Sequence, residues 1–332
     1  MSEIIVTQII RNYHDKNSVD RIYNNLNLIL SNKISLQTLR CPFPSNGFIN
    51  KIKNILWINK INTNLIHLTG DINYLAIFLK KPFVITILDL GMPGRFSSFK
   101  SFFYQLFWLK IPINKANTVI AISNKIKNDL IKISPKDKNK IITIYVPLES
   151  IYKYTNKNFV NHKVTLLHIA TSLHNKNTLR VLMAIQGLKN IKIRIIGKLS
   201  FELINFLNKN EIDYYNNFNI SDSDMLKEYI NADLVVFPSL YEGFGMPIIE
   251  AQAIGRVVLT SSLEPMLEIA SNAAIFVNPF DFLDIRKGII KYIENKDNLI
   301  TNLTNKGLVN VNRFNVNIIS DQLYNIYLSN AK

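Results

Sequence analysis

A strand that breaks into a glycine-containing turn and then becomes a helix, within residues 237–250, is the feature that most constrains this chain. The β-rich run at residues 234–237 is short and is followed by a proline and a serine, so we predict a buried parallel strand that ends there. Gly243 and Gly245 allow the backbone to come close to a ligand, and Pro247 suits the first turn of a helix. Since the free N–H groups and dipole of a helix N-terminus attract anions, this segment predicts an anion-binding turn.

Two carboxylates frame the turn. Glu242 lies on the loop, and Glu250 lies about one turn inside the predicted helix. Both side chains can therefore face the crevice that forms at the carboxyl ends of parallel strands.

Strand-like and helix-like segments alternate along the rest of the chain, without an internal repeat. The strands predicted in the first half lie at residues 4–10, 65–68, 83–88, 118–122 and 141–144. A segment rich in Pro, Asn, Tyr and Lys at residues 146–163 is predicted to be a linker. The strands predicted after it lie at residues 165–169, 191–196, 234–237, 257–260 and 274–277.

This alternation of strands and helices is typical of doubly wound α/β domains. Because 332 residues exceed what one hydrophobic core usually supports, two domains are expected.

The composition narrows the location of the protein. No segment approaches the ~20 consecutive apolar residues of a membrane span. The chain starts Met-Ser-Glu-Ile-Ile and leads directly into a predicted strand, so no signal peptide is expected. A single cysteine, Cys41, cannot form an internal disulfide. A cytoplasmic location is the expectation that follows.

The net charge of +15 has two interpretations. Lysines scattered over solvated faces would follow simply from a composition rich in Lys, Asn and Ile. Alternatively, the basic surface attracts an anionic membrane surface. Without clustered arginines, an RNA-binding aromatic signature or zinc-ligand spacing, no nucleic-acid partner is expected.

The motif Glu-Gly-Phe-Gly-Met-Pro-Ile-Ile-Glu at 242–250 and the segments at 250–258 and 261–270 closely resemble the nucleotide-sugar site of family 4 retaining glycosyltransferases. The resemblance is strong over residues 164–277 and moderate over 64–123. It implies the α/β GT-B fold, in which two Rossmann-like doubly wound domains face a cleft.

The resemblance also implies how the chain is divided. Residues 1–150 would form the N-terminal acceptor-side domain, and residues 160–312 the C-terminal nucleotide-sugar-binding domain. A C-terminal helix at 314–330 would pack back on the N-terminal domain.

As a member of this family, the chain would be a hexosyltransferase that moves a hexose from a UDP- or GDP-sugar to a glycan, lipid-linked acceptor. The reaction would serve polysaccharide or lipopolysaccharide assembly. The family implies same-face attack by the acceptor, with the leaving phosphate oxygen taking its proton. No His, Asp or Glu cluster has the spacing of metal ligands, so neither a metal nor another cofactor is expected.

Several donor contacts are implied residue by residue. Glu250 would accept hydrogen bonds from the ribose, and Glu242 would orient sugar hydroxyls and favour the oxocarbenium-like state. The backbone contacts to the sugar would come from Gly243, Phe244, Gly245 and Met246.

A second part of the donor site is implied after the strand at 165–169. Lys176 would neutralise the donor diphosphate, while Thr171 or Ser172 stands where the family has an arginine. The base would lie near Gly197, Lys198 and Ile220. A glycine at such a turn is also commonly only a backbone requirement.

The N-terminal domain departs from the family at Leu88, where relatives have a histidine. Asp89 is then the polar group at the end of that strand, acting in catalysis or serving as a loop or helix cap. The segment 67–71 also ends a strand, and His67 is either an acceptor-side residue or a residue without a functional role.

The segment 99–110 carries aromatic side chains around much of its circumference and lysines at both ends. Such a helix either packs in the core or lies at a membrane interface, which would make the protein peripheral on the inner face of the membrane.

Two other classes of function stay open. The missing arginine and histidine fit a catalytically weak or inactive GT-B sugar-nucleotide-binding protein. A GT-B isomerase or phosphorylase is the other class, although we find no cofactor-lysine context for a phosphorylase.

Overall fold

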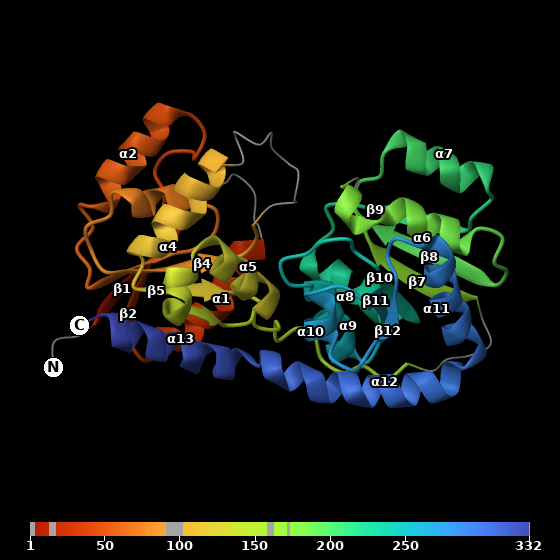
Figure 1. The fold of residues 1–332 in the computed structure, drawn as a ribbon. Coiled ribbons are helices and arrows are strands. Elements are labelled where there is room, and N and C mark those ends of the chain that lie inside the picture. The colour runs from red at the N-terminus through yellow and green to blue at the C-terminus, as the bar shows by residue number, and fades with distance from the viewer. Residues whose placement is uncertain (1–3, 13–17, 91–101, 158–162, 171–172, 332) are drawn as a thin grey trace. The chain divides into compact units, whose positions relative to one another are not determined.

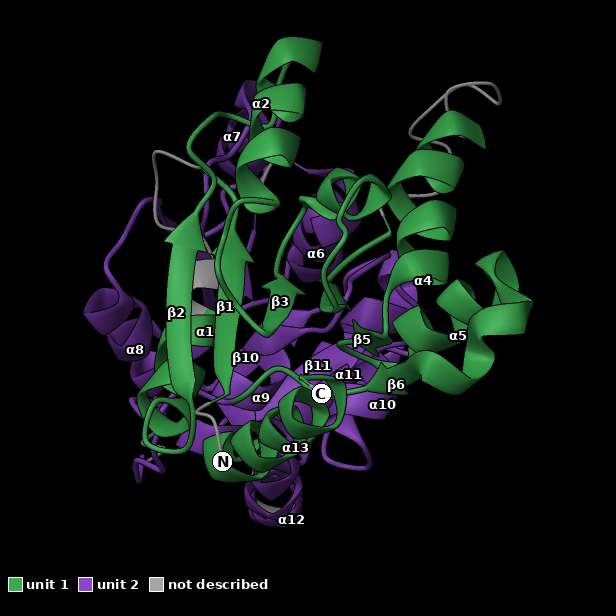
Figure 2. Cartoon of the chain, turned by 90° about the vertical axis from the view of Figure 1, so that its left-hand side faces the viewer, with its two compact units in different colours: residues 1–147, 314–332 green, residues 148–313 purple. Residues whose placement is uncertain are grey.

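The computed structural model describes residues 4–12, 18–90, 102–157, 163–170 and 173–331. The chain divides into two compact units, which Figure 2 colours separately. Unit 1 comprises residues 1–147 and 314–332, and unit 2 comprises residues 148–313.

Unit 1 is built on a six-stranded parallel sheet with the order β2-β1-β3-β4-β5-β6. Its strands are β1 (Ile5–Ile10), β2 (Ser35–Arg40), β3 (Leu65–Leu68), β4 (Phe83–Ile87), β5 (Thr118–Ala121) and β6 (Ile141–Thr143). The central strands β3, β4 and β5 are buried along their whole length, because helices cover the sheet.

The helices of unit 1 are α1 (Ser18–Leu30), α2 (Phe48–Ile58), α4 (Ile111–Lys115), α5 (Asn124–Ile133) and α13 (Val316–Asn330). Shorter helical segments are η1 (Asn73–Ile77), η2 (Gln105–Lys110) and η3 (Pro135–Lys140). Helix α13 packs beside α1 although nearly three hundred residues separate them (Figure 1). Its buried residues Ile319, Leu323 and Tyr327 join the core formed by the strands and α1.

Unit 2 has a second six-stranded parallel sheet, with the order β12-β11-β10-β7-β8-β9. Its strands are β7 (Val164–Ile169), β8 (Ile191–Ile196), β9 (Tyr214–Asn217), β10 (Leu234–Phe237), β11 (Val257–Ser261) and β12 (Ile275–Val277).

The helices of unit 2 are α6 (Thr178–Ile185), α7 (Phe201–Lys209), α8 (Asp222–Asn231), α9 (Met246–Ile254), α10 (Met266–Ala270), α11 (Phe282–Glu294) and α12 (Lys296–Asn310). Two short helical segments are η4 (His174–Lys176) and η5 (Val311–Phe314). Helices α6 and α11 bury one stripe each against the sheet in a shared core. Within the described ranges, no helix is both long and apolar enough to cross a bilayer.

The strands predicted from the sequence are confirmed, each within one residue at either end. Strands β2 and β9, each at an edge of one sheet, were not predicted from the sequence. The predicted linker begins as a part of unit 2, because Lys157 pairs with the buried Asp233 and Thr155 N donates to Ile254 O at 3.2 Å.

Candidate functional site

The candidate site lies at the ends of two neighbouring strands of unit 2. Strands β7 and β10 pair in parallel, so their carboxyl ends lie at the same edge of the sheet. We call residues 173–177 the β7 loop and residues 238–245 the β10 loop. Thr171 and Ser172 lie outside the described residues.

Hydrogen bonds join these two loops. Leu240 N donates to Asn175 O at 2.8 Å, and Asn175 Nδ2 donates to Tyr241 O at 3.2 Å. Asn177 Nδ2 donates to Pro238 O at 3.0 Å. The loops therefore form one platform at the carboxyl edge of the sheet.

An ion pair crosses this platform. Lys176 Nζ lies 2.7 Å from Glu242 Oε1, and the two side chains are only 18% and 15% exposed. Lys176 Nζ also lies 5.1 Å from the ring centroid of Phe237, which shields one side of the ammonium group. A positive and a negative charge are thus held side by side, where water screens them less than at an open surface.

Two helices begin at the platform. Asn177 precedes α6 with a φ of 60°, and Gly245 precedes α9 with a φ of 114°, so both take left-handed conformations. A Cβ at Gly245 would also come within 3.1 Å of Ile248 Cδ1, which favours glycine there. The first N–H groups of both helices therefore begin at the ends of adjacent strands, an arrangement that attracts anions.

Glu250 lies in α9 and is 6% exposed. Its Oε2 accepts a hydrogen bond of 2.5 Å from the hydroxyl group of Tyr229, a fully buried residue of α8. Tyr229 was not predicted from the sequence, because it lies in another helix and no spacing within one element relates it to Glu250.

The residues predicted near the base lie at the same edge of the sheet, next to β8 and β9. Gly197 directly follows β8 with a φ of 141°, a conformation that requires glycine for backbone reasons alone. Its N–H donates to Asn217 O at 2.7 Å. Lys198 is exposed, and Ile220 is half-buried just before α8.

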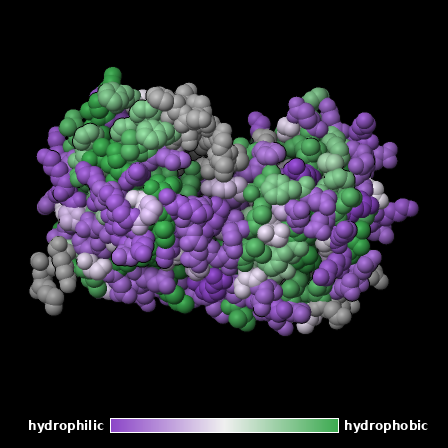
Figure 3. Space-filling model, viewed as in Figure 1, coloured by the Kyte–Doolittle hydropathy of each residue, from purple (hydrophilic) through white to green (hydrophobic). Residues whose placement is uncertain are grey.

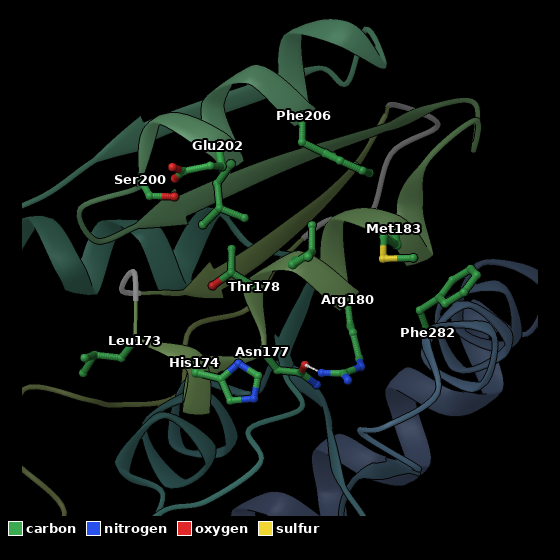
Figure 4. A pocket seen from close by; sticks show the side chains of 12 residues that line it. Leu173, His174, Asn177, Thr178, Arg180, Met183, Ser200, Glu202, Phe206 and Phe282 are labelled. Atoms are coloured by element: carbon green, nitrogen blue, oxygen red, sulfur yellow. Dashed lines mark hydrogen bonds between the residues drawn. The ribbon is translucent and has the colours of Figure 1, made fainter. Parts of the chain in front are cut away.

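A cavity of about 710 Å³ lies beside the β7 loop, between α6, α7 and the start of α11 (Figure 4). Arg180 lines it and donates from NH1 to Asn177 Oδ1 at 3.0 Å. Arg180 is therefore a cation near the β7 loop that the sequence analysis missed. Arg180 was hard to predict from the sequence, because it lies inside α6 rather than in the loop motif.

The predicted residues of unit 1 have different surroundings. Leu88 lines a small apolar crevice with Ile122 and Val146, and Asp89 is exposed just beyond β4. His67 is fully buried, and burial lowers its pKa to about 3. The acceptor-side interpretation of His67 is therefore wrong, because its ring lies within unit 1 against Tyr327 and Thr86.

The aromatic segment is described from Phe102 onward. Phe102, Phe103 and Phe107 are exposed, whereas Leu109 is buried and the indole N–H of Trp108 donates to Asp71. One side of the helix therefore packs and the other faces solvent, and residues 99–101 lie outside the described residues.

No three or more His, Cys, Asp and Glu side chains of the described residues gather as metal ligands. An Asp-x-Asp triplet is present at residues 222–224, at the N-terminus of α8. There Ser221 caps the helix, because its Oγ accepts from Asp224 N at 3.1 Å. The Asp224 carboxylate in turn accepts from Ser221 Oγ at 2.7 Å and pairs with Lys227 at 2.8 Å.

Comparison with known families gives a match between residues 153–307 and glycosyl transferases group 1. The O-antigen chain mannosyltransferase RfbU of Salmonella typhimurium is 26% identical over 235 residues, which cover 67% of this chain and 63% of that protein. The capsular polysaccharide biosynthesis glycosyltransferase CapM of Staphylococcus aureus is 27% identical over 260 residues, covering 70% and 67%. The match thus spans about two thirds of these relatives.

Solved structures show the same fold. A glycosyltransferase from Rickettsia africae superimposes with a TM-score of 0.80 at 18% identity, over 100% of both chains. Anabaena Alr3699/HepE, solved in complex with UDP-glucose, superimposes with a TM-score of 0.79 at 15% identity, over 98% of this chain and 100% of that one. The predicted GT-B fold is thereby confirmed, with one Rossmann-like sheet in each unit.

Proposed function

Since this chain belongs to glycosyl transferases group 1 and has the GT-B fold, we propose that it is a metal-independent, retaining hexosyltransferase. It would transfer a hexose from a UDP- or GDP-sugar to a lipid-linked glycan acceptor in polysaccharide or lipopolysaccharide assembly. The names of the relatives support this pathway, since RfbU is an O-antigen chain mannosyltransferase and CapM is a capsular polysaccharide biosynthesis glycosyltransferase.

The ion pair between Lys176 and Glu242 is the observation that carries the proposal. Cleavage of the anomeric C–O bond builds positive charge on the sugar and negative charge on the departing diphosphate. Lys176 and the N-termini of α6 and α9 would stabilise the diphosphate, while Glu242 would favour the positive sugar. The Lys176 ammonium and the Glu242 carboxylate already lie at contact distance on the platform. A bound donor would replace this ion pair with one contact to each of the two groups.

The other site residues would contact different parts of the donor. Glu250 would bind the ribose, and the amides at residues 243–246 would contact the sugar. Gly197, Lys198 and Ile220 would lie near the base, and Thr171 or Ser172 near the diphosphate. Asp89, which is exposed just beyond β4, would be a further catalytic polar group.

Kinetics of three variants test these roles. Lys176→Ala and Glu242→Ala should each lower kcat by about 10²–10³-fold, because each removes a group that meets charge developed in the transition state. Glu250→Ala should mainly raise the donor KM, because ribose is bound equally in the ground and transition states. Retention would be read from the anomeric configuration of the product by NMR, and activity should survive a chelator.

Arg194→Gln is the matched control for the ion pair. Arg194 pairs with Glu228, and their side chains are similarly shielded, at 25% and 11% exposure. This variant should lose stability without the loss of kcat, since the pair lies between β8 and α8 rather than on the platform. Wild-type kinetics in the Lys176 and Glu242 variants would remove the platform from the active site.

A weak or inactive sugar-nucleotide-binding protein is the second candidate function. The apolar crevice at Leu88 favours it, since relatives of the resembled family have a histidine there. Such a protein would bind UDP or GDP in calorimetry but would neither transfer nor hydrolyse any donor sugar.

We also propose that unit 1 binds an anionic membrane surface, and helix α2 gives the reason. Its buried residues are Asn54 and Ile58. Asn54 Nδ2 donates to Phe43 O at 2.9 Å and to the Tyr74 hydroxyl at 3.0 Å, so a polar side chain attaches the helix. Its large apolar side chains instead face solvent with exposures of 40–80%: Phe48, Ile49, Ile52 and Leu56. Figure 3 shows apolar residues gathered over this helix.

Lysines accompany the apolar face of α2. Lys51 Nζ lies 4.7 Å from the ring centroid of Trp108, so α2 lies beside the aromatic segment at residues 102–110. Lys53 and Lys60 are exposed on the same helix or just beyond it. Exposed apolar side chains among lysines, in a chain of net charge +15, fit an interface with anionic lipids.

Vesicle co-sedimentation tests the membrane proposal. Binding to phosphatidylglycerol-containing vesicles should exceed binding to neutral phosphatidylcholine vesicles and should weaken with salt, since the Debye length is ~8 Å at physiological ionic strength. Phe48→Ser together with Ile49→Ser should release the protein. Phe201→Ser, which removes an equally exposed side chain from α7, should not. Equal binding to both vesicles, or an unaffected double variant, would contradict the proposal.

A further inference from the structure

A buried hydrogen bond holds the carboxylate of Glu250. The hydroxyl of Tyr229 donates to Glu250 Oε2 at 2.5 Å, and Tyr229 is 0% exposed. A buried carboxylate is stable only where donors satisfy it, and a charge-assisted hydrogen bond is the stronger kind. The bond joins α8 to α9 and leaves the carboxylate with a defined orientation.

Tyr229 is itself held in place. Tyr152, at the start of unit 2, is 4% exposed and packs edge-on against the ring of Tyr229, with ring centroids 5.7 Å apart and planes at 87°. The segment around Tyr152 is fastened nearby, because Arg256 NH1 donates to Thr155 O at 3.0 Å. The hydroxyl of Tyr229 is therefore a fixed donor rather than one of several conformers.

We propose that Tyr229 is a positioning residue that orients Glu250 toward the donor ribose, with Tyr152 supporting its ring. This inference rests on the proposed function, in which Glu250 binds the ribose. Two adjacent ribose hydroxyls need a carboxylate in one orientation. Without the tyrosine hydroxyl, one oxygen of Glu250 would lose its fixed donor, and the added cost of orienting the carboxylate when the donor binds would weaken binding.

The test compares nucleotides with and without ribose hydroxyls. Calorimetry would measure the Kd of UDP, GDP and their 2′,3′-dideoxy forms for the wild type, Tyr229→Phe and Glu250→Ala. In the wild type, loss of the hydroxyls should weaken binding of the preferred nucleotide by about tenfold or more. In Tyr229→Phe, the ribose form should bind about tenfold more weakly while the dideoxy form binds as before. The donor KM should rise and kcat should stay within about twofold of wild type.

Tyr292→Phe is the matched control. Tyr292 is also fully buried, and its hydroxyl donates to Asp233 O at 2.8 Å in the same unit. Its loss should lower stability comparably but leave ribose discrimination intact. Tyr152→Leu keeps the Tyr229 hydroxyl and loosens its ring, so it should show a smaller loss of discrimination and stands in where Tyr229→Phe does not fold.

The outcomes separate the two proposals. If Glu250→Ala loses ribose discrimination and Tyr229→Phe keeps it, the inference about Tyr229 is overturned while the proposed function stands. If Glu250→Ala also keeps it, the assignment of Glu250 to the ribose fails first. If Tyr292→Phe loses discrimination as fully as Tyr229→Phe, the effect is general destabilisation and the inference is overturned.

Discussion

At the scale of single residues, unit 1 buries a chain of polar side chains that ties its sheet to α13. Gln8 Nε2 donates to the Tyr327 hydroxyl at 2.9 Å, and that hydroxyl lies 2.6 Å from His67 Nδ1. His67 Nε2 lies 2.8 Å from Thr86 Oγ1, which also accepts from the Tyr23 hydroxyl at 2.9 Å. Since the Tyr327 hydroxyl accepts from Gln8, it donates its own proton in a hydrogen bond to His67 Nδ1. His67 then donates from Nε2, as a neutral ring.

This neutral histidine predicts a pH dependence of unit 1. The pKa of His67 is lowered to about 3 in the folded chain, against ~6.5 when unfolded. Below pH ~6.5 the unfolded chain binds a proton that the folded chain does not, so stability falls as pH falls, by ~1.4 kcal/mol per pH unit until about pH 3. Urea unfolding at several pH values, followed by tryptophan fluorescence, would measure it, because both tryptophans, Trp57 and Trp108, lie in unit 1.

A variant isolates the contribution of His67. His67→Gln keeps donor and acceptor atoms but does not titrate, so its stability should depend on pH less steeply than that of the wild type. His174→Gln, at an exposed histidine of unit 2, should match the wild type. An unchanged slope in His67→Gln would show that another group carries the acid sensitivity.

Site residues could be predicted from the sequence only where their partners are neighbours in the chain. The motif from Glu242 to Glu250 is contiguous, so both carboxylates and the intervening turn were predictable. Tyr229 lies 21 residues before Glu250 in a different helix, and only the packing of α8 on α9 brings them together. Arg180 was missed for a similar reason, since the turn at Asn177 aims it back toward the loop.

At the scale of elements, the interior strands and the edge strands β6 and β12 were predictable, whereas the edge strands β2 and β9 were not. Interior strands such as β10 are continuous runs of buried apolar residues, because helices cover both faces of a parallel sheet. Strands β2 and β9 each have one neighbour, β1 and β8, and are largely half-exposed. Their sequences, Ser-Leu-Gln-Thr-Leu-Arg and Tyr-Tyr-Asn-Asn, are correspondingly polar, so pairing along β1 and β8 rather than local preference determines them.

Helix α2 shows the limit of amphipathic patterns. An apolar stripe usually indicates the buried face of a helix. Here the stripe containing Phe48 and Leu56 faces solvent, while Asn54 attaches the helix through its amide. The pattern alone does not state which face the fold covers. For this reason the sequence indicated a membrane interface only at the segment 99–110.

At the scale of the whole molecule, unit 1 is assembled from both ends of the chain, because residues 314–332 return to it after the whole of unit 2. Leu323 is 2% exposed in the unit 1 core, so Leu323→Ala should destabilise unit 1 by about 2–5 kcal/mol through the lost burial and the cavity it leaves. Ile318→Ala, on the exposed face of the same helix, should change stability by less than about 0.5 kcal/mol. Tryptophan fluorescence would follow both variants, since it reports on unit 1 alone. An equally small effect in the two variants would mean that α13 does not complete the unit 1 core in solution.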